Sequence, residues 1–300
     1  MKTTNIFFIT TIILILFSAC DKIEPPFTEG CTNCCGEANI HEPIKRILVE
    51  EFTGHKCSNC PNATRILDNL SEIYCDHLVI VACHPTNQDF TEPNEFGPLS
   101  TDFRKEECAE IGNEFGFWGF PSALINRKNT DNNYFLFTSE WGAVIDNLLF
   151  DSNGEKKLPD LYIDINYEIT DFDNKSIELQ VFVNYLNQLS GNYNLVVLIT
   201  ENNIISGQYD GDELIENYVH NHVYRSAVNG AWGEPIENNL KDLTFDTIEK
   251  NYSFTFNSLN NINWDDQWNN MDSCSIVAYV YDTETNEIIQ ASERKINLTD

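Results

Sequence analysis

The 300-residue sequence predicts two folded parts, an α/β domain followed by an all-β sandwich. Residues 44–150 alternate strand and helix patterns, which is typical of α/β domains. Residues 160–300 instead contain short runs in which apolar and polar side chains alternate, with no helix of core length. A polar linker at 151–159 separates the two patterns, and the chain is long enough for two domains.

The N-terminus carries export signals. Residues 1–20 contain a basic start and the apolar stretch Ile6–Phe17, which is too short to cross a bilayer. Two small residues and then Cys20 follow, and this FSAC sequence resembles a bacterial lipobox, in which the cysteine becomes a lipidated N-terminus. Several acyl chains would anchor the protein stably to a membrane. A plain signal peptide with an incidental cysteine is the alternative, and residues 21–43 form a tether in either case.

Charge excludes one class of partner. The sequence has 47 acidic and 18 basic residues, a formal net charge of −29 and a pI near 4.3. Such a surface repels phosphate backbones, so no nucleic-acid partner is expected. After the signal peptide no stretch is long and apolar enough to cross a membrane, which predicts a protein that is exported and tethered.

Ten cysteines indicate an oxidising compartment. The short cluster in the tether has two interpretations, disulfides or a zinc site with His41. Export favours disulfides, and a single cluster lacks the second knuckle of zinc sites, so no metal is predicted. Cys83 and Cys108 flank a loop and a helix, and they are the preferred pair, although spacing does not determine connectivity. The disulfide candidates are Cys31, Cys34, Cys35, Cys83 and Cys108.

The α/β part centres on ILVEEFTGHKCSNCPNATRILDNL, residues 47–70. Its apolar start predicts a buried strand, and apolar residues at helical spacing after Pro61 predict a helix that begins near Cys60. A cysteine at a helix N-terminus meets unpaired N–H groups that stabilise its thiolate. Cys57, expected to be the more exposed cysteine, is therefore the candidate nucleophile, and Cys60 is the candidate resolving thiol. A structural disulfide and half of a zinc site are the alternatives.

Further elements complete the α/β pattern. Leu78–Cys83 is a continuous apolar run of the kind found in central strands. Thr101–Phe115 predicts a helix, and Ser139–Phe150 a closing amphipathic helix with Ser139 as its N-cap. Between them lies a glycine-rich turn followed by a strand, and Pro121 in this turn is well placed for a cis peptide bond.

This order of strand, C-x-x-C-P, helix, strand and glycine-rich turn with proline resembles the thioredoxin fold. The resemblance implies that Pro121 is cis and lies beside the cysteine pair, with the Phe120 backbone meeting the substrate chain. It also implies that Glu51 is a buried acid that assists proton transfer at Cys60. The sequence departs from the family at Lys56, where an aromatic residue is usual, and in the dipeptide between the cysteines. The reduction potential therefore stays open.

The second part reads as an immunoglobulin-like β-sandwich of about seven strands. His220 and His222 share one face of a predicted strand, but no third ligand is nearby, so packing is favoured over metal binding. No cofactor is expected. The predicted strands are Leu161–Ile169, Ser176–Tyr185, Tyr193–Thr200, Tyr218–Val228, Tyr252–Phe256, Cys274–Tyr281 and Ile288–Ile296.

A second resemblance covers nearly the whole mature chain. The lipobox, the tether, EFTGHKCSNCPNA, GFPSALINR and YVHNHVYRSAVNGAWGEPI are similar to the Omp28-related outer-membrane lipoproteins. This similarity implies a lipid anchor in the outer membrane, on its periplasmic or its surface face. It also implies a thioredoxin-like domain joined to a β-sandwich, and it defines no activity.

Two functions are weighed. In the first, a lipoprotein exchanges disulfides with the thiols or disulfides of exported proteins: Cys57 attacks, Cys60 resolves, Glu51 moves the proton and Pro121 shapes the peptide groove. Phe120, His55 and Lys56 are expected to meet the substrate. In the second, a surface binding or adhesion lipoprotein keeps the cysteine pair as an inert structural disulfide.

Overall fold

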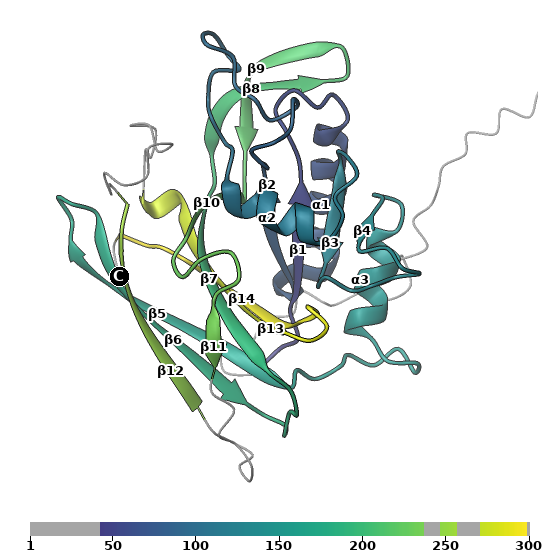
Figure 1. Cartoon of the computed structure of the whole chain (residues 1–300), viewed down its shortest axis with the longest axis vertical. Coiled ribbons are helices and arrows are strands. Elements are labelled where there is room, and N and C mark those ends of the chain that lie inside the picture. Colours follow the sequence, from purple (N-terminus) through teal and green to yellow (C-terminus); the bar gives the residue numbers. More distant parts are fainter. Residues whose placement is uncertain (1–42, 237–246, 257–270, 299–300) are drawn as a thin grey trace, which may run out of the picture.

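The computed structural model describes residues 43–236, 247–256 and 271–298 and shows a β-rich protein whose helices gather at one end (Figure 1). The described strands form a nine-stranded mixed sheet, a three-stranded sheet and a two-stranded hairpin. The large sheet has the order β14-β13-β7-β10-β2-β1-β3-β4, with β11 paired to β7. The β-rich character agrees with the prediction, and the large sheet contains strands from both parts of the chain.

The helical end is built around strand β1, which is buried along its whole length. It pairs in parallel with β2 and antiparallel with β3. Helices α1 and α3 cover one face of these strands, while α2 covers the other face. Burial on both faces explains the continuous apolar runs in the sequence. The elements are β1 (Ile47–Phe52), α1 (Cys60–Tyr74), the 3-10 helix η1 (Cys75–His77), β2 (Leu78–Cys83), α2 (Glu106–Glu114), β3 (Ser122–Ile125), β4 (Phe135–Leu136) and α3 (Trp141–Leu149).

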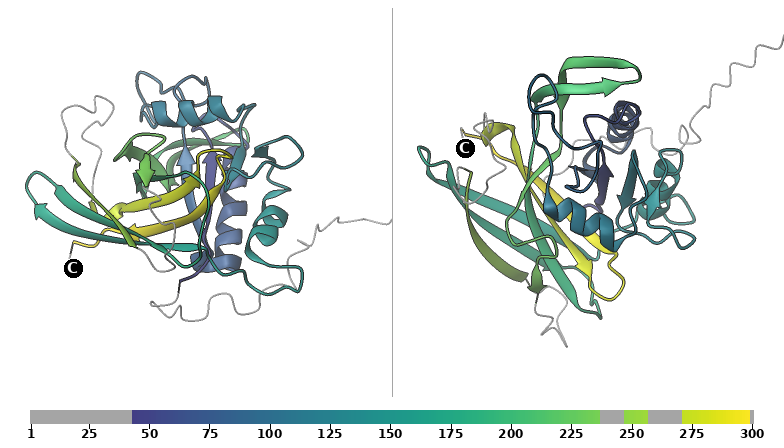
Figure 2. Two further views of the ribbon diagram at one scale, coloured as in Figure 1. Left: turned by 60° about the horizontal axis from the view of Figure 1, so that its bottom comes forward. Right: turned by 45° about the horizontal axis from the view of Figure 1, so that its top comes forward.

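The other end is a sandwich of two β-layers. The three-stranded sheet β12-β6-β5 packs against β7 and β13 of the large sheet through one shared apolar core. Two further views show the three-stranded sheet on the side of β7 and β13 that faces away from the helices (Figure 2). The elements are β5 (Leu161–Asp171), β6 (Ser176–Tyr185), β7 (Tyr193–Glu201), β11 (Glu234–Ile236), β12 (Thr247–Thr255), the 3-10 helix η2 (Met271–Ser273), β13 (Cys274–Asp282) and β14 (Ile288–Lys295).

One strand joins the two ends. β10 (Val223–Ala227) pairs antiparallel with β7 and in parallel with β2, where Val223 lies opposite Ala82. The Ala82 N–H donates a hydrogen bond to the His222 carbonyl at 2.7 Å. The expected immunoglobulin-like sandwich with two sheets of its own is therefore not found, because one of its layers continues into the sheet of the α/β part. Alternating side chains reveal which face of a strand is buried but not which strand lies beside it.

The predicted strand Tyr218–Val228 is in fact two strands. β9 (Glu213–His220) ends before β10 begins, because His222 adopts a left-handed conformation with φ 56°. β9 pairs with β8 (Ile204–Asp210), a strand the sequence analysis missed. This β8–β9 hairpin projects beside β2 and α1 (Figure 1). His220 and His222 therefore do not share one strand face.

Two helices start later than predicted. Helix α2 begins at Glu106 rather than Thr101, because Asp102 instead accepts hydrogen bonds from the backbone and side chain of Arg104. Helix α3 has Glu140, not Ser139, at its N-cap position, and the Glu140 carboxylate accepts a bond from the Phe137 N–H at 2.8 Å.

A buried ion pair fastens the two ends together. Arg127, which has no exposed surface, donates hydrogen bonds of 2.8 and 2.7 Å to the Glu50 carboxylate and one of 2.7 Å to the Tyr279 hydroxyl. Glu50 belongs to β1 and Tyr279 to β13, so the guanidinium links the α/β end to the sandwich. The rings of Phe115 and Trp232 lie over the same guanidinium at 5.3 and 5.6 Å.

Replacing this arginine should strongly destabilise the protein. Arg127→Met leaves the Glu50 charge buried without its partner, and we expect the free energy of unfolding to fall by about 3–5 kcal/mol. The matched control is Lys128→Met, whose partner Glu287 is a surface residue, with an expected change below about 1 kcal/mol. Denaturant unfolding measures both, and equal losses would contradict a special role for the buried pair.

Candidate functional site

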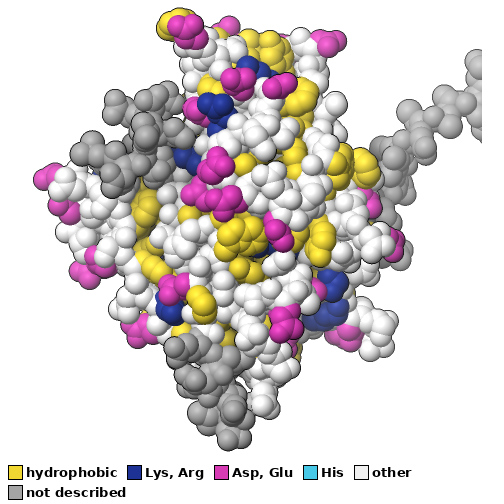
Figure 3. Space-filling view, in the orientation of Figure 1, with side chains coloured by type: hydrophobic (Ala, Val, Ile, Leu, Met, Phe, Trp, Pro, Cys, Tyr) yellow, Lys and Arg dark blue, Asp and Glu magenta, His cyan; other side chains and the backbone are white. Residues whose placement is uncertain are grey.

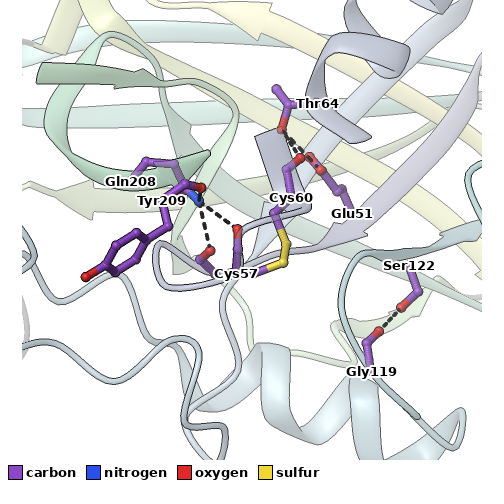
Figure 4. Close-up of a disulfide and its surroundings, with 9 residues drawn as sticks. Glu51, Cys57, Cys60, Thr64, Gly119, Ser122, Gln208 and Tyr209 are labelled. Carbon is purple, nitrogen blue, oxygen red and sulfur yellow. Dashed lines mark hydrogen bonds between the residues drawn. A yellow bond between two sulfur atoms is a disulfide. The ribbon is translucent and has the colours of Figure 1, made fainter. Parts of the chain in front are cut away.

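The cysteine pair lies in the loop between β1 and α1, where the sequence placed it (Figure 4). Cys57 and Cys60 form a disulfide, with their Cα atoms 5.4 Å apart. Cys60 opens α1 and Pro61 occupies its first turn, as predicted. A side chain at Gly54 would meet the Phe90 carbonyl oxygen at 2.6 Å, so glycine is needed for this loop to approach its neighbour closely.

The disulfide is covered. Cys57 is 4% exposed and Cys60 is 1% exposed, so Cys57 is the more exposed of the two, as expected, but both are buried in this state. The β8–β9 hairpin packs on the cysteine loop: the Gln208 side-chain amide donates to the carbonyls of Cys57 at 3.1 Å and Gly54 at 3.3 Å. The Tyr209 N–H donates to the His55 carbonyl at 3.0 Å, and Arg65 of α1 pairs with Asp210 at 2.9 Å.

Sequence reasoning missed the hairpin and its site residues. Gln208 is almost fully buried and touches the cysteine loop, although it lies about 150 residues away in the sequence. The available signal was Asp210-Gly211, a dipeptide typical of hairpin turns, between the alternating residues of β8 and β9. That signal predicts a hairpin, but it contains no information on where the hairpin docks.

Glu51 lies beneath Cys60, as the sequence predicted. It is 3% exposed, and it lines a cavity of about 20 Å³ together with Cys60. Burial raises the pKa of Glu51 to about 8, while a hydrogen bond from the Thr64 hydroxyl at 3.3 Å acts in the opposite direction. The same hydroxyl lies 3.3 Å from the Cys60 carbonyl (Figure 4). The carboxyl is therefore mostly protonated at neutral pH and placed to exchange a proton near the disulfide.

The Phe120–Pro121 peptide is cis, as expected. Ser122 directly after it pairs with Phe52, the last residue of β1, so the proline lies where the cysteine loop begins. Phe120 is half-buried and its ring packs against Phe117 at 4.8 Å and Phe90 at 6.0 Å. The turn that carries this proline is closed by a hydrogen bond from Ser122 to Gly119 at 2.7 Å (Figure 4).

Comparison with known proteins gives the family. The model of outer membrane protein Omp28 matches residues 109–300, just under two thirds of the chain. The chain belongs to the Omp28 family. Membership places this Omp28-family protein in the outer membrane and confirms the predicted relationship. The match begins after the cysteine pair, so it says nothing about Cys57 and Cys60.

One solved structure shows a shared fold, and two others are similar at lower TM-scores. HBP35 of Porphyromonas gingivalis is similar with a TM-score of 0.60 and 12% identity, over 85% of this chain and 76% of that one. A domain of the outer membrane lipoprotein Omp28 from the same organism is 24% identical over 48% of this chain and 93% of its own, with a TM-score of 0.32. An Agrobacterium tumefaciens protein gives a TM-score of 0.47 at 13% identity, over 86% and 98% of the two chains. No curated protein sequence matches the chain.

His55 is buried in this Omp28-family protein, whereas Lys56 is partly exposed, so contact of Lys56 with a substrate stays a prediction. His55 is buried, and burial lowers its pKa to about 4, so the ring is neutral at pH 7 and does not stabilise a thiolate by charge. It also does not present its ring to a substrate. Lys56 is half-buried, and its N–H donates to the Phe90 carbonyl at 3.0 Å.

The other cysteines need correction too. Cys83 and Cys108 are free, buried thiols joined by a hydrogen bond, so the preferred disulfide is not formed here. The segment between them is held instead by a backbone bond from Lys105 to His84 at 2.8 Å. Cys20, Cys31, Cys34 and Cys35 lie outside the described residues, and their lipidation and pairing stay predictions.

The described parts of the chain offer no group of three or more His, Cys, Asp or Glu side chains that could bind a metal. Within the same parts, no helix has both the length and the apolar character needed to cross a bilayer.

Three buried histidines surround one ring next to the site. His55, His84 and His220 have ring centroids 5.9, 5.1 and 4.7 Å from that of Phe103. They come from the cysteine loop, the end of β2 and the hairpin. Burial lowers the pKa of His220 to about 4 and also lowers that of His84.

These buried histidines should make the free energy of unfolding depend on pH. An unfolded histidine binds a proton near pH 6.5 and folded His220 only near pH 4, so the folded state loses stability as the pH falls through that window. Glu51, with a raised pKa, opposes this slope, so the informative quantity is the difference between variant and native protein. Between pH 6.5 and 4, the free energy of unfolding of His220→Gln should fall by up to about 1.4 kcal/mol less per pH unit than that of the native protein.

Urea unfolding at several pH values measures the slope. Asn221→Ala, a neighbouring change without a titrating group, should shift the free energy equally at every pH. If His220→Gln keeps the native slope, the histidine does not fold in its neutral form.

Proposed function

We propose that this outer-membrane protein of the Omp28 family exchanges disulfides with exported proteins through a thioredoxin-like site. One observation carries the proposal: a Cys57–Cys60 disulfide at the start of a helix has a buried acid below it and a cis proline beside it. Each component corresponds to a step of exchange, namely nucleophile, resolving thiol, proton acceptor and substrate surface.

The helix start favours the thiolate form of the reduced pair. The first turn of α1 contains no acidic residue that would offset the positive end of the helix dipole. The positive end of the helix dipole stabilises a sulfur anion. This lowers the barrier to attack by Cys57 and also makes each cysteine a better leaving group.

The sulfur bonds and the protons of the exchange reaction can all be accounted for with the residues present. The Cys57 thiolate attacks one sulfur of a partner disulfide, and the partner's other sulfur leaves as a thiolate that takes up a proton from solvent. In the fraction of molecules in which Glu51 is ionised, the Cys60 thiol then gives its proton to the Glu51 carboxylate and attacks Cys57, and the second partner sulfur leaves as a thiolate. The result is the Cys57–Cys60 disulfide and a reduced partner, and the reverse sequence oxidises a partner dithiol.

Aromatic side chains near the cis proline suit an extended polypeptide. Phe90, Trp118 and Phe137 are exposed, and the Trp118 and Phe137 rings lie 4.5 Å apart. Phe120 joins Phe90 to the proline turn. Aromatic groups of this kind bind apolar side chains while leaving the backbone free to pair.

The hairpin controls access to Cys57. Gln208 is the residue that holds the hairpin to the cysteine loop most directly, with bonds to the carbonyls of Cys57 and Gly54. Gln208→Ala should accelerate reduction of the disulfide by dithiothreitol several-fold, because a few hydrogen bonds of about 1 kcal/mol each no longer hold the cover.

Stopped-flow fluorescence or rapid alkylation measures that rate. Gln180→Ala, at an exposed position of β6, is the control and should react like the native protein. An unchanged rate in Gln208→Ala would mean that the hairpin does not limit access.

Equilibration of the purified full-length protein in graded glutathione buffers tests the function itself. Peptide mass spectrometry after alkylation reports Cys57 and Cys60 separately from the other cysteines. We expect a reduction potential between about −270 and −120 mV, the range of dithiol oxidoreductases. Cys60→Ala should also trap mixed disulfides between Cys57 and exported proteins, whereas Cys57→Ala should trap none.

A binding lipoprotein with an inert disulfide is the second candidate. The burial of both cysteines under the hairpin favours it. The molecular surface, on which acidic side chains are scattered among apolar ones, would then be the functional part (Figure 3). A potential below about −300 mV, as structural disulfides have, supports this candidate and rejects exchange.

A further inference from the structure

The buried Glu51 carboxyl has a side-chain connection that leads outward. Its hydrogen-bond donor is the Thr64 hydroxyl on α1, 3.3 Å from Oε1. The Tyr218 side chain on β9 lines the same small cavity as Thr64, so a water molecule in that cavity can connect the two hydroxyls. Glu51, Thr64 and Tyr218 all line the small cavity next to Cys60, and Tyr218 is partly exposed.

The hairpin holds this tyrosine in place. The Tyr218 ring packs against that of buried His220 at 4.9 Å, and the hairpin is anchored by Arg65–Asp210 and Gln208. Tyr218 therefore reaches the cysteine site from the C-terminal half of the chain. A hydroxyl that both donates and accepts a hydrogen bond passes a proton on without gaining a lasting charge.

The proposed disulfide exchange needs a path along which protons move between the buried Glu51 carboxyl and solvent. When Cys60 resolves a mixed disulfide, its proton goes to the Glu51 carboxylate, and the carboxylate must be regenerated before the next turnover. The carboxyl is 3% exposed, so the proton has to travel through neighbouring groups. A cavity of about 20 Å³ has room for about one water molecule beside them.

We infer that Thr64 and Tyr218 conduct protons between Glu51 and solvent, which makes Tyr218 of the hairpin a positioning residue of the dithiol site. The inference rests on the proposed exchange function for its role, but the connection itself is a property of the folded protein. Further titratable groups lining the same cavity are Cys60, Asp68, His84, His220 and His222. Asp68 lies outermost of these and is exposed, so it is a natural acceptor for the released proton.

Tyr218→Phe tests the inference, because it keeps the ring and removes the hydroxyl. We expect resolution of a mixed disulfide at Cys57 to slow about tenfold at neutral pH, a modest part of what general acid–base catalysis contributes. Small buffers such as imidazole should restore the rate in a concentration-dependent way. Thr64→Val should slow resolution of the mixed disulfide in the same way as Tyr218→Phe, and Thr64→Ser, which keeps a hydroxyl, should resolve it at the native rate.

Tyr209→Phe is the matched control. Tyr209 belongs to the same hairpin, but its ring points away from the disulfide (Figure 4). This variant should match the native protein in rate, pH profile and buffer response. If Tyr218→Phe also matches the native protein in all three, the inference is wrong.

Titration of the Glu51 carboxyl separates this result from failure of the proposed function. Infrared difference spectra or ¹³C NMR of the oxidised protein follow the carboxyl without any exchange reaction. Loss of the Tyr218 hydroxyl should move the pKa of Glu51 further upward, because the chain of donors that stabilises the carboxylate is interrupted. If the native protein exchanges no disulfides, this titration alone decides: an upward shift supports the connection, and an unchanged titration rejects it.

Discussion

The pairing of β10 with the edge of β2 is the constraint on which the rest of the structure depends. Strand β2 is buried, and an unpaired backbone edge away from water costs the full desolvation of its polar groups. β10 satisfies that edge, with Val223 opposite Ala82, and at the same time pairs with β7 of the sandwich. Since β9 ends only two residues before β10 begins, this docking also fixes the hairpin over the cysteine loop.

Side chains reinforce the same junction from within. Arg127 connects Glu50 of β1 with Tyr279 of β13, and aromatic rings exclude water from the pair. β13 presents alternate residues to two cores, with Ile276 facing the three-stranded sheet and Val277 facing the α2 side. A sheet that is covered on both faces along its length behaves as one body, so the cysteine site and the sandwich share their stability.

The features predicted correctly are those that depend on interactions between residues close together in the sequence. Cys60 and Pro61 at a helix start, the apolar run Leu78–Cys83 and the cis bond at Pro121 follow from residues close together in the sequence. Gln208 and Tyr218 could not be predicted as site residues, because their place is set by the docking of β10. Cys83 and Cys108 were brought together as expected, but proximity does not decide whether two thiols are oxidised. The neutral state of His55 likewise depends on burial by distant segments.

The burial of the disulfide is compatible with the proposed exchange function if the hairpin can move away from the cysteine loop. Suppose that lifting the hairpin breaks about three hydrogen bonds of about 1 kcal/mol each. The open form is then populated at roughly 1%, and small thiols react more slowly by the same factor. A protein partner that supplies its own backbone groups to the carbonyls of Cys57 and His55 recovers part of that loss, whereas a small molecule does not. The hairpin would thus favour polypeptide partners over low-molecular-weight thiols, since selectivity follows from which reactant can replace the bonds that Gln208 and Tyr209 release.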